Sequence, residues 1–270
     1  MVNCVTIFTF ATVERLRTFG NMLVVSLAVT DLMVGLIMPL DAVNWMPEVS
    51  KQLQTSEMWC VLRLCWLNIG CVASFLNIVI IATDRYTYIV HPFLYERVVT
   101  SQKMLVTIVI GWVLAVLWGT VTIYDNKFSE VKLCDPIEAF SKGYAVYGAT
   151  AILVTCFTIT AVLYTLIFRL ALSKLRTVVP GIPKNNTNNI LHQQLQVAKQ
   201  SLAVFLVFAI SWTPHYAIYL VHVIAPQPYR ARAFATTVGF CNSGLNFFIY
   251  VIFNRAFRTK IKCQCVIVLM

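Results

Sequence analysis

Charged residues are scarce in this chain of 270 residues: Asp, Glu, Lys and Arg make up only 12% of it, whereas 59% is hydrophobic. An ordinary soluble domain has about 25% charged and about 45–50% apolar residues. Acidic residues are especially few, 11 against 21 Lys and Arg, which leaves a net charge of +10. This composition excludes a soluble enzyme, a disordered tail and a secreted disulfide scaffold. It predicts an integral membrane protein whose basic residues lie in loops between spans.

The sequence also lacks the patterns that catalysis needs. It contains no nucleophile–base pair, no metal-ligand cluster and no phosphate-binding loop, so we do not expect an enzyme. No apolar stretch shows the period-2 alternation of a barrel strand, and no half of the chain repeats the other, which argues against a two-half transporter. We therefore expect an all-α fold, and we expect its basic loops to meet lipid phosphates rather than nucleic acid.

Long apolar runs, in contrast, are abundant. A helix needs about 20 mostly apolar residues to cross a hydrocarbon core about 30 Å thick. The N-terminal run Val2–Val13 has only 12 residues and is too short to span. Because its basic residues follow rather than precede it, it is not a secretory signal, and we interpret it as the inner half of a first helix. Six stretches are long enough to span: Thr18–Leu40, Leu64–Thr83, Met104–Tyr124, Gly143–Phe168, Gln200–Tyr229 and Ala233–Phe253.

The charges of the loops predict the orientation of the chain. If the loop after Val13 is cytoplasmic and the sides alternate, the cytoplasmic side holds 14 Lys and Arg against three acids. The other side then holds seven residues of each sign. The positive-inside rule requires such an asymmetry, so we expect a multi-pass protein with a cytoplasmic C-terminus.

One acid lies inside a predicted span. Asp31 stands in the middle of the second span, where a carboxylate needs protonation, a counter-ion or water, and this makes it a candidate functional residue. Ser74, Asn242, Ser243 and Asn246 offer further oxygen atoms from later spans. The set is a candidate cage for Na⁺ or a polar network that holds helices together, and spacing alone leaves both open.

A second motif, Asp84-Arg85-Tyr86, stands at the inner end of the third span. Arg85 at a membrane edge could simply extend its charged end to the interface. The tripeptide is common by chance. Its position directly after the apolar run IVIIAT and before IVHPFLY is not, and this points to a functional motif.

Together these motifs resemble those of the class A, rhodopsin-like G-protein-coupled receptors, over essentially the whole chain. Each motif is weak alone, but all of them occur in the family's order and spacing. The matching residues are Asn3; Asp31 in LAVTDL; Cys60, 25 residues before Arg85; Asp84-Arg85-Tyr86; Trp112; Tyr164; Phe208 with Ser211-Trp212-Thr213-Pro214; Asn242-Ser243-Gly244-Leu245-Asn246-Phe247-Phe248-Ile249-Tyr250; and Asn254-Arg255-Ala256-Phe257-Arg258.

The resemblance implies a single seven-transmembrane receptor domain over residues 1–270, in which the first helix lacks its outer half. A short amphipathic helix eight is expected to follow the seventh helix. The expected helices are 1–13, 18–47, 57–89, 103–124, 140–173, 191–225, 230–253 and 254–263.

The resemblance also implies a mechanism at the plasma membrane. An extracellular ligand shifts a two-state equilibrium towards a conformation in which the sixth helix has moved outward and admits a heterotrimeric G protein. The implied switch residues are Asp84, Arg85, Tyr86, Tyr164, Trp212, Pro214, Asn246 and Tyr250.

Three further sites follow from the same resemblance. It favours the Na⁺ interpretation of Asp31, Ser74, Asn242, Ser243 and Asn246, with Na⁺ as an allosteric ion and no other cofactor. It implies an extracellular disulfide between Cys60 and Cys134. Cys263 and Cys265, after helix eight, are candidates for palmitoylation or remain unmodified thiols.

The ligand is not named by the sequence. Leu67 stands where the amine-binding branch carries an aspartate, and Phe240 stands where a retinal-type receptor carries a lysine, so both readings are disfavoured. Asp41 could still serve a cationic ligand or peptide, or it is a solvated charge at a helix end. The expected lining of a mixed aromatic and polar pocket is Asp41, Leu67, Asn68, Cys71, Trp212, His215, Tyr216, Tyr219 and Thr236.

Three departures from the family pattern affect these expectations. Phe247 replaces the proline of the seventh-helix motif, Cys156 replaces a fifth-helix proline, and Gln194 stands where many members carry a glutamate that pairs with the arginine of the third helix. Without that pair we expect basal signalling that is not low. The alternatives are a transporter or channel, in which Asp31 and the amides line an ion path, and a receptor fragment that does not signal.

Overall fold

The computed structural model of the chain describes residues 2–13, 18–43, 55–125, 127–128, 134, 139–176, 187–254 and 257–259. In these ranges the regular elements are helices, which confirms the predicted all-α fold. They are α1 (Val2–Thr12), α2 (Phe19–Val43), α4 (Glu57–Val90), α5 (Pro92–Val98), α6 (Ser101–Tyr124), the π-helical turn η2 (Gly143–Gly148), α8 (Ala149–Arg176), α9 (Thr187–Ile224) and α10 (Tyr229–Phe253).

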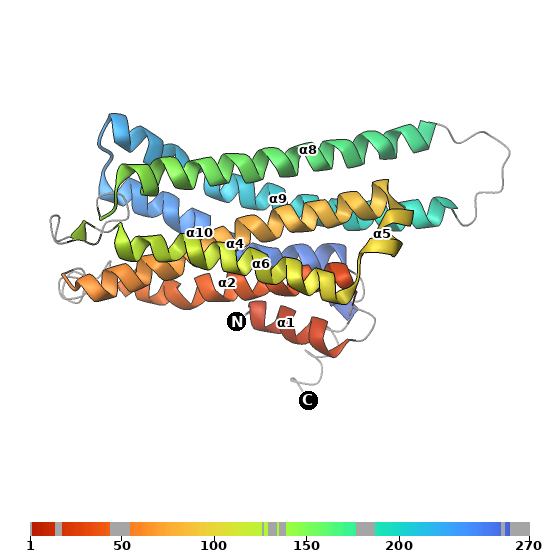
Figure 1. Ribbon diagram of the computed structural model, residues 1–270, viewed down its shortest axis with the longest axis horizontal. Coiled ribbons are helices and arrows are strands. Elements are labelled where there is room, and N and C mark those ends of the chain that lie inside the picture. Colours follow the sequence, from red (N-terminus) through yellow and green to blue (C-terminus); the bar gives the residue numbers. More distant parts are fainter. Residues whose placement is uncertain are drawn as a thin grey trace.

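Six long helices run side by side along the length of the molecule, and the short α1 lies beside α2 near one end (Figure 1). The six are long and apolar enough to cross a membrane, whereas α1 has 11 residues. One end of the bundle, which we call the disulfide end, holds Cys60 and Cys134. The opposite end holds α5, the last turns of α8 and the first turns of α9, and we call it the α5 end.

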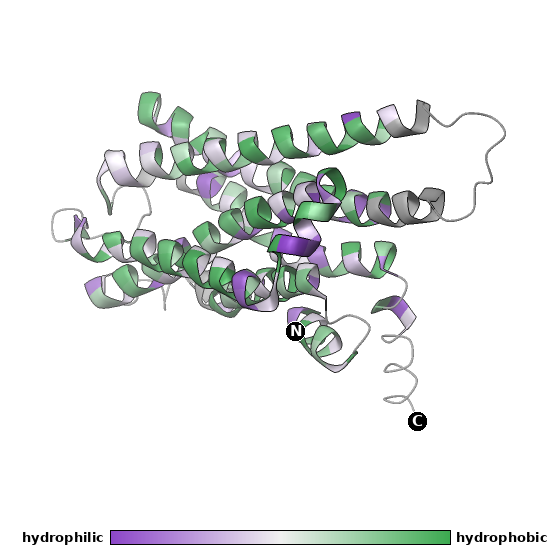
Figure 2. Cartoon of the chain, turned by 45° about the vertical axis from the view of Figure 1, so that its right-hand side comes forward, coloured by the Kyte–Doolittle hydropathy of each residue, from purple (hydrophilic) through white to green (hydrophobic). Residues whose placement is uncertain are grey.

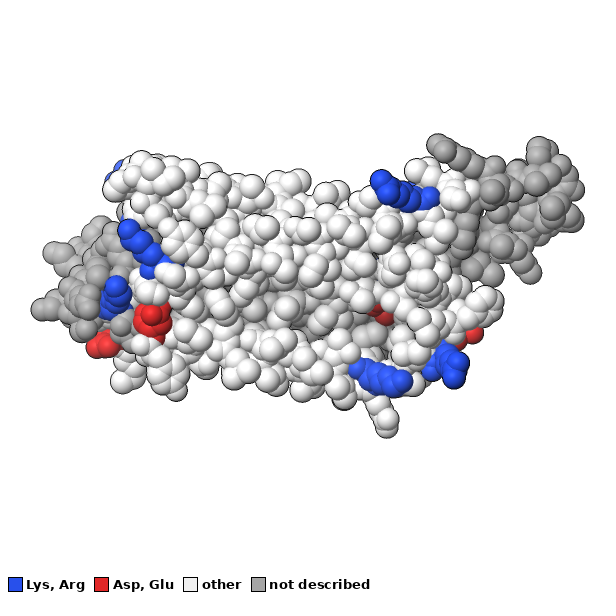
Figure 3. Space-filling view, turned by 45° about the horizontal axis from the view of Figure 1, so that its top comes forward, with Lys and Arg blue, Asp and Glu red and all other residues white. Residues whose placement is uncertain are grey.

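The outer surface of the bundle is apolar. Figure 2 shows hydrophobic colouring along most of each long helix, and Figure 3 shows charged side chains gathered near the two ends with almost none across the middle. On α6 alone, Leu105, Val106, Val109, Ile110 and Val113 are exposed. Exposing such a contiguous apolar belt to water would be unfavourable, whereas the hydrocarbon of a bilayer solvates it.

The local sequence explains where α4 ends and where α5 and α6 begin. The α4 helix ends at Val90 because the residue before a proline is disfavoured in the α-helical conformation. Pro92 then occupies the first turn of α5, where its missing N–H costs nothing. Thr100 caps α6 by accepting a hydrogen bond from the N–H of Lys103 (3.3 Å). The short α5 was not predicted from the sequence.

Several predicted boundaries differ from those of the structure. The fifth helix was expected from residue 140, but the chain first makes a turn, because the Asp125 carboxylate accepts hydrogen bonds from the N–H (3.2 Å) and hydroxyl (2.6 Å) of Ser141. Regular structure therefore starts with η2 at Gly143. The sixth helix begins at Thr187 rather than at residue 191, since no proline or glycine follows Pro183 in this stretch. Of the predicted helix eight, only residues 257–259 lie among the described helical residues.

Aromatic residues form the centre of the bundle between α4, α8, α9 and α10. Phe75 and Phe208 are fully buried, and their rings meet edge to face with centroids 5.1 Å apart. Glycines permit close packing beside this core. A Cβ on Gly239 would come within 3.0 Å of the Trp212 ring, and one on Gly119 would collide with Ile69. The core therefore joins the two ends of the molecule through tightly packed rings.

Candidate functional site

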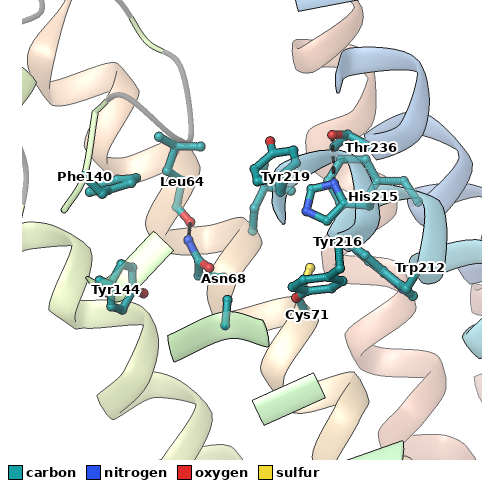
Figure 4. A pocket seen from close by; sticks show the side chains of 13 residues that line it. Leu64, Asn68, Cys71, Phe140, Tyr144, Trp212, His215, Tyr216, Tyr219 and Thr236 are labelled. Atoms are coloured by element: carbon teal, nitrogen blue, oxygen red, sulfur yellow. Dashed lines mark hydrogen bonds between the residues drawn. The ribbon is translucent and has the colours of Figure 1, made fainter. Parts of the chain in front are cut away.

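A cavity lies near the disulfide end, between α4, η2, α8, α9 and α10 (Figure 4). Its volume is about 80 Å³. Small-molecule pockets usually measure about 300–1,000 Å³, so a ligand larger than a few atoms requires side chains to move apart. The lining residues are Leu64, Leu67, Asn68, Cys71, Phe140, Tyr144, Ala149, Trp212, His215, Tyr216, Tyr219, Thr236 and Phe240.

The cavity brings together eight of the nine residues expected to line a pocket. The ninth is Asp41, whose side chain lies outside the described residues. Sequence reasoning missed Phe140 and Tyr144, which come from the segment before α8, where no helical periodicity indicates which side chains face inward. Phe240 could have been found, because its position had already been considered for a retinal lysine.

Two polar groups of the cavity offer hydrogen-bond acceptors. The Thr236 hydroxyl donates its proton to the carbonyl of Arg232 (2.9 Å), so the hydrogen bond between His215 Nδ1 and Thr236 Oγ1 (3.0 Å) requires His215 to be the donor. A neutral His215 ring with its proton on Nδ1 then leaves Nε2 free to accept. The amide of Asn68 donates to the Leu64 carbonyl (2.9 Å), which leaves its Oδ1 as a second acceptor. Figure 4 shows the hydrogen bonds between His215 and Thr236 and between Asn68 and Leu64.

None of the 13 lining side chains, all of them described, is Asp, Glu, Lys or Arg. Aromatic rings dominate instead. The His215 and Tyr219 rings lie with centroids 4.1 Å apart, and Trp212 packs below them, 5.3 Å from the His215 ring. A cation entering this space would lose its hydration without gaining a counter-ion from these walls, which is costly.

A disulfide fixes the rim of the cavity. Cys60 of α4 is bonded to Cys134, which confirms the predicted pair. The Nη2 atom of Arg63, also on α4, lies 3.1 Å from the Sγ atom of Cys134. Cys134 is therefore anchored to α4 beside the cavity.

From the cavity floor a chain of ring contacts leads toward the α5 end. Each ring touches the next at a centroid distance between 5.3 and 6.2 Å. The chain crosses between α9 and α8, so that displacement of one ring requires its neighbours to repack. In order, its members are His215, Trp212, Phe208, Phe157, Phe205 and Tyr164.

Pro214 breaks the regular hydrogen bonding of α9 beside this chain of rings. A proline inside a helix removes one backbone donor and clashes with the carbonyl four residues earlier, which bends the helix. The Thr213 hydroxyl donates to the carbonyl of Ala209 (2.6 Å), four residues before it. The helix therefore has a local weak point at the depth of Trp212.

A buried polar cluster surrounds Asp31. The Asn246 amide donates to Asp31 Oδ2 (2.8 Å), and Asp31 is only 1% exposed. Three buried oxygen atoms, Asp31 Oδ1, Asn242 Oδ1 and Asn246 Oδ1, have no hydrogen-bond partner among the described residues. Oxygen atoms left without donors are the ligands that a hard cation prefers, so the donor set fits Na⁺.

One of the expected partners of Asp31 is engaged elsewhere. The Ser74 hydroxyl donates to Thr30 Oγ1 (3.0 Å) rather than to Asp31, and Thr30 donates to the Leu27 carbonyl (2.7 Å). The carbonyl of Ser243 accepts a hydrogen bond from the Asn3 amide (2.9 Å), which ties α1 to α10. Sequence reasoning missed Thr30, whose role depends on the neighbouring helix.

At the α5 end, Arg85 is held on two sides. Its Nη2 atom lies 3.1 Å from Asp84 Oδ2, and its guanidinium rests against Gly20 so closely that a Cβ there would collide with it. Tyr95 of α5 donates from its hydroxyl to Asp84 Oδ1 (2.9 Å). Burial and the neighbouring Asp84 carboxylate raise the pKa of Tyr95, so this hydroxyl keeps its proton. Gly20 and Tyr95 were not singled out in the sequence.

The remaining predicted switch residues surround this end. The Tyr86 ring packs against His91 with centroids 5.7 Å apart. The Tyr164 ring is buried and stacks on Phe205, whereas Tyr250 packs edge to face against Phe10. The predicted palmitoylation residues Cys263 and Cys265, and the Gln194 side chain, lie outside the described residues.

These features, a bundle of membrane-crossing helices with a rim disulfide, a buried acid and an acid–arginine pair at the opposite end, are those of a helical membrane receptor. Comparison with known families agrees. The model of the "7 transmembrane receptor (rhodopsin family)" matches residues 2–250, so the chain belongs to this family of G-protein-coupled receptors, which are multi-pass membrane proteins and not enzymes.

Curated relatives in this family are distant. The chain is 27% identical over 260 residues to a histamine H2 receptor of Cavia porcellus, covering 91% of the chain and 70% of the relative. It is 28% identical over 285 residues to a D(5)-like dopamine receptor of Takifugu rubripes, covering 90% and 60%. It is 27% identical over 256 residues to the melatonin receptor type 1B-B of Danio rerio, covering 92% and 72%.

Proposed function

We propose that this receptor binds an extracellular ligand in the disulfide-end cavity and activates a heterotrimeric G protein at the α5 end. The observation that carries the proposal is the unbroken series of ring contacts from His215, in the cavity, to Tyr164. The excess of basic residues at the α5 end supports a cytoplasmic orientation of that end and of the C-terminus, in the plasma membrane.

The proposed movement is an outward swing of the α5-end half of α9 about Pro214. It has to break the hydrogen bond from Gln196 Nε2 to the Phe253 carbonyl (3.0 Å), which links α9 to α10 at that end. Arg85 then leaves Asp84 and contacts the G protein, while Tyr164 and Tyr250 turn inward to support it. A ligand drives this change only to the extent that it binds the active state more tightly than the inactive state.

The chemistry of the cavity favours a small, uncharged aromatic ligand that carries an N–H or O–H donor. Aromatic walls suit a flat ring, and His215 Nε2 and Asn68 Oδ1 offer acceptors. The names of the relatives specify histamine, dopamine and melatonin. The first two carry a protonated amino group, for which these walls offer no carboxylate. Melatonin, an uncharged acylated indole, matches this chemistry better.

We also propose that Na⁺ binds beside Asp31 and stabilises the inactive state. The unpartnered oxygens of Asp31, Asn242 and Asn246 would hold it, with Ser74 and Ser243 at the edge of the site. The ion would supply the positive charge that a buried carboxylate otherwise lacks.

A G-protein activation assay in intact cells tests the main proposal. The chain is challenged with matched pairs of compounds, an aromatic amine and its N-acetyl derivative, and we expect the uncharged member to be more potent. Arg85→Ala should abolish the response, whereas Arg97→Ala, on the exposed surface of α5, should leave it intact. A full response from Arg85→Ala would refute the mechanism. Greater potency of the amines, lost in Asp41→Asn, would instead assign the ligand to Asp41.

A further inference from the structure

A second cavity opens on the membrane-facing surface near the α5 end, between α4, α5 and α6. Its volume is about 340 Å³, several times that of the cavity at the disulfide end. Its rim includes Thr83, Val98, Lys103 and Thr107, all of them exposed. Apart from Asp84, the residues that line this space have no role in the receptor mechanism proposed above.

The walls of this cavity are less polar than their residue types indicate. Its three threonines, Thr83, Thr87 and Thr107, each donate their hydroxyl proton to a carbonyl four residues earlier in the same helix (2.9, 2.8 and 2.9 Å). The Tyr95 hydroxyl donates to Asp84, so its proton is also engaged. The lining therefore offers a ligand mostly methyl and methylene groups, from these threonines and from Ile80 and Met104.

The charge in this cavity comes from one residue at its rim. Lys103 is exposed and forms no ion pair with any residue in the described ranges. The acid in the lining, Asp84, is already neutralised by Arg85 at 3.1 Å. The space thus combines one cationic group at the membrane edge with apolar walls that continue into the exposed apolar face of α6, where Leu105 and Val106 lie.

We propose that this cavity binds an anionic phospholipid of the cytoplasmic leaflet. Its phosphate pairs with Lys103, and the upper part of one acyl chain lies against Ile80, Met104 and the threonine methyls. Charge complementarity selects this occupant, because the cytoplasmic leaflet is negatively charged and attracts Lys and Arg close to its surface. A free anion would use Lys103 but leave the apolar walls empty. The proposal rests on the orientation proposed above, with the α5 end in the cytosol.

The site has a consequence for its neighbours. Tyr95 forms one wall of the cavity and also holds Asp84, the partner of Arg85. A lipid seated there fills the space beneath α5 and supports the contact between Tyr95 and Asp84. The lipid composition of the membrane is therefore linked to the position of α5, which borders the Asp84–Arg85 pair.

Native mass spectrometry of the purified full chain tests the site. The chain is taken from nanodiscs that contain phosphatidylcholine and phosphatidylserine, and the phosphatidylserine molecules retained per chain are counted. Lys103→Gln should reduce retention about fivefold, the effect of one basic residue near an anionic surface. Lys199→Gln removes an exposed lysine of α9 near the same end but away from the cavity and should have no effect. Thr107→Met keeps every charge but fills the cavity, and it should also reduce retention.

The outcomes separate this proposal from its rivals. Equal losses in Lys103→Gln and Lys199→Gln, or unchanged retention in both Lys103→Gln and Thr107→Met, would overturn it. Displacement of the lipid by soluble glycerophosphoserine at equal concentration would show a site for free anions only, which also overturns it. Orientation is tested separately by labelling intact cells with an impermeant amine reagent, so a wrong orientation is distinguishable from a missing lipid site.

Discussion

The ring chain between the cavity and the α5 end makes Phe208 the most informative single position. Phe208 is 1% exposed, and its ring touches those of Phe75 (5.1 Å), Phe157 (6.0 Å) and Trp212 (6.1 Å). Replacing it with alanine removes all three contacts and leaves a cavity in the middle of the chain of rings. We expect ligand binding to survive and G-protein activation to fall, because the walls of the ligand cavity remain while the connection to Tyr164 is broken.

The size of the effect follows from the contacts. An aromatic pair contributes about 0.5–1.5 kcal/mol, so three pairs give about 1.5–4.5 kcal/mol of lost stability. Transfer of the ring between lipid and protein interior adds little inside a membrane, because both are apolar, so lost packing dominates. Thermal unfolding of the purified receptor measures the loss, and binding and activation assays measure the separation of affinity from efficacy.

Phe248→Ala is the matched control, since Phe248 is 55% exposed on the outer surface of α10. It removes the same side chain and should change neither stability nor activation by a comparable amount. If both variants lowered the melting temperature equally, or if Phe208→Ala activated G protein with wild-type efficacy, the ring chain would not be the link between the two ends. Phe208→Leu, which keeps most of the volume, should fall between the wild type and Phe208→Ala.

Three other perturbations give direct tests. Asp31→Asn should abolish the extra thermal stability that NaCl confers over choline chloride, and an unchanged NaCl effect would exclude the proposed ion site. Thr236→Val removes the acceptor that fixes the proton of His215 on Nδ1. The potency of a donor-bearing ligand should then fall by about tenfold or less, because one hydrogen bond contributes about 0.5–1.5 kcal/mol. An unchanged dose–response curve would refute that orientation of the ring. Gly20→Ala forces the Arg85 guanidinium from its place and should raise ligand-independent signalling. The control is Gly35→Ala, whose added Cβ meets nothing within 4 Å and should not raise it. Equal second-messenger levels in the two variants would count against a restraint of Arg85 by its contact with Gly20.

Much of this architecture could be predicted because it depends on local pattern. Long apolar runs identify spanning helices whatever their packing, since the bilayer fixes the length required. Eight cavity residues could likewise be named from motifs on α4, α9 and α10, because residues three and four apart in a helix share a face. Helix ends were less predictable: at Ser141 the start of regular structure depends on Asp125, 16 residues earlier.

The missed residues share one property, which is that their roles depend on another element. Thr30 matters because Ser74, 44 residues later, donates to it, and Tyr95 matters because the short α5 places it on Asp84. Gly20 matters only because the Arg85 side chain crosses to α2. Neither periodicity nor a motif marks such positions, so only the folded chain reveals them.

Two series of contacts start at the Trp212 ring. Whether they act together or separately determines how variants in each should affect activation. One follows the rings through Phe208 towards Tyr164, between α9 and α8. The other runs down α10, where Gly239 lies against the Trp212 ring and the polar cluster of Asn242 and Asn246 begins less than one turn later. Both routes meet one ring beside the weak point at Pro214, so we expect them to bias the same two-state element rather than two independent ones. Combining a variant on each route should therefore give an activation defect smaller than the sum of the single defects; strict additivity would mean that the routes act separately.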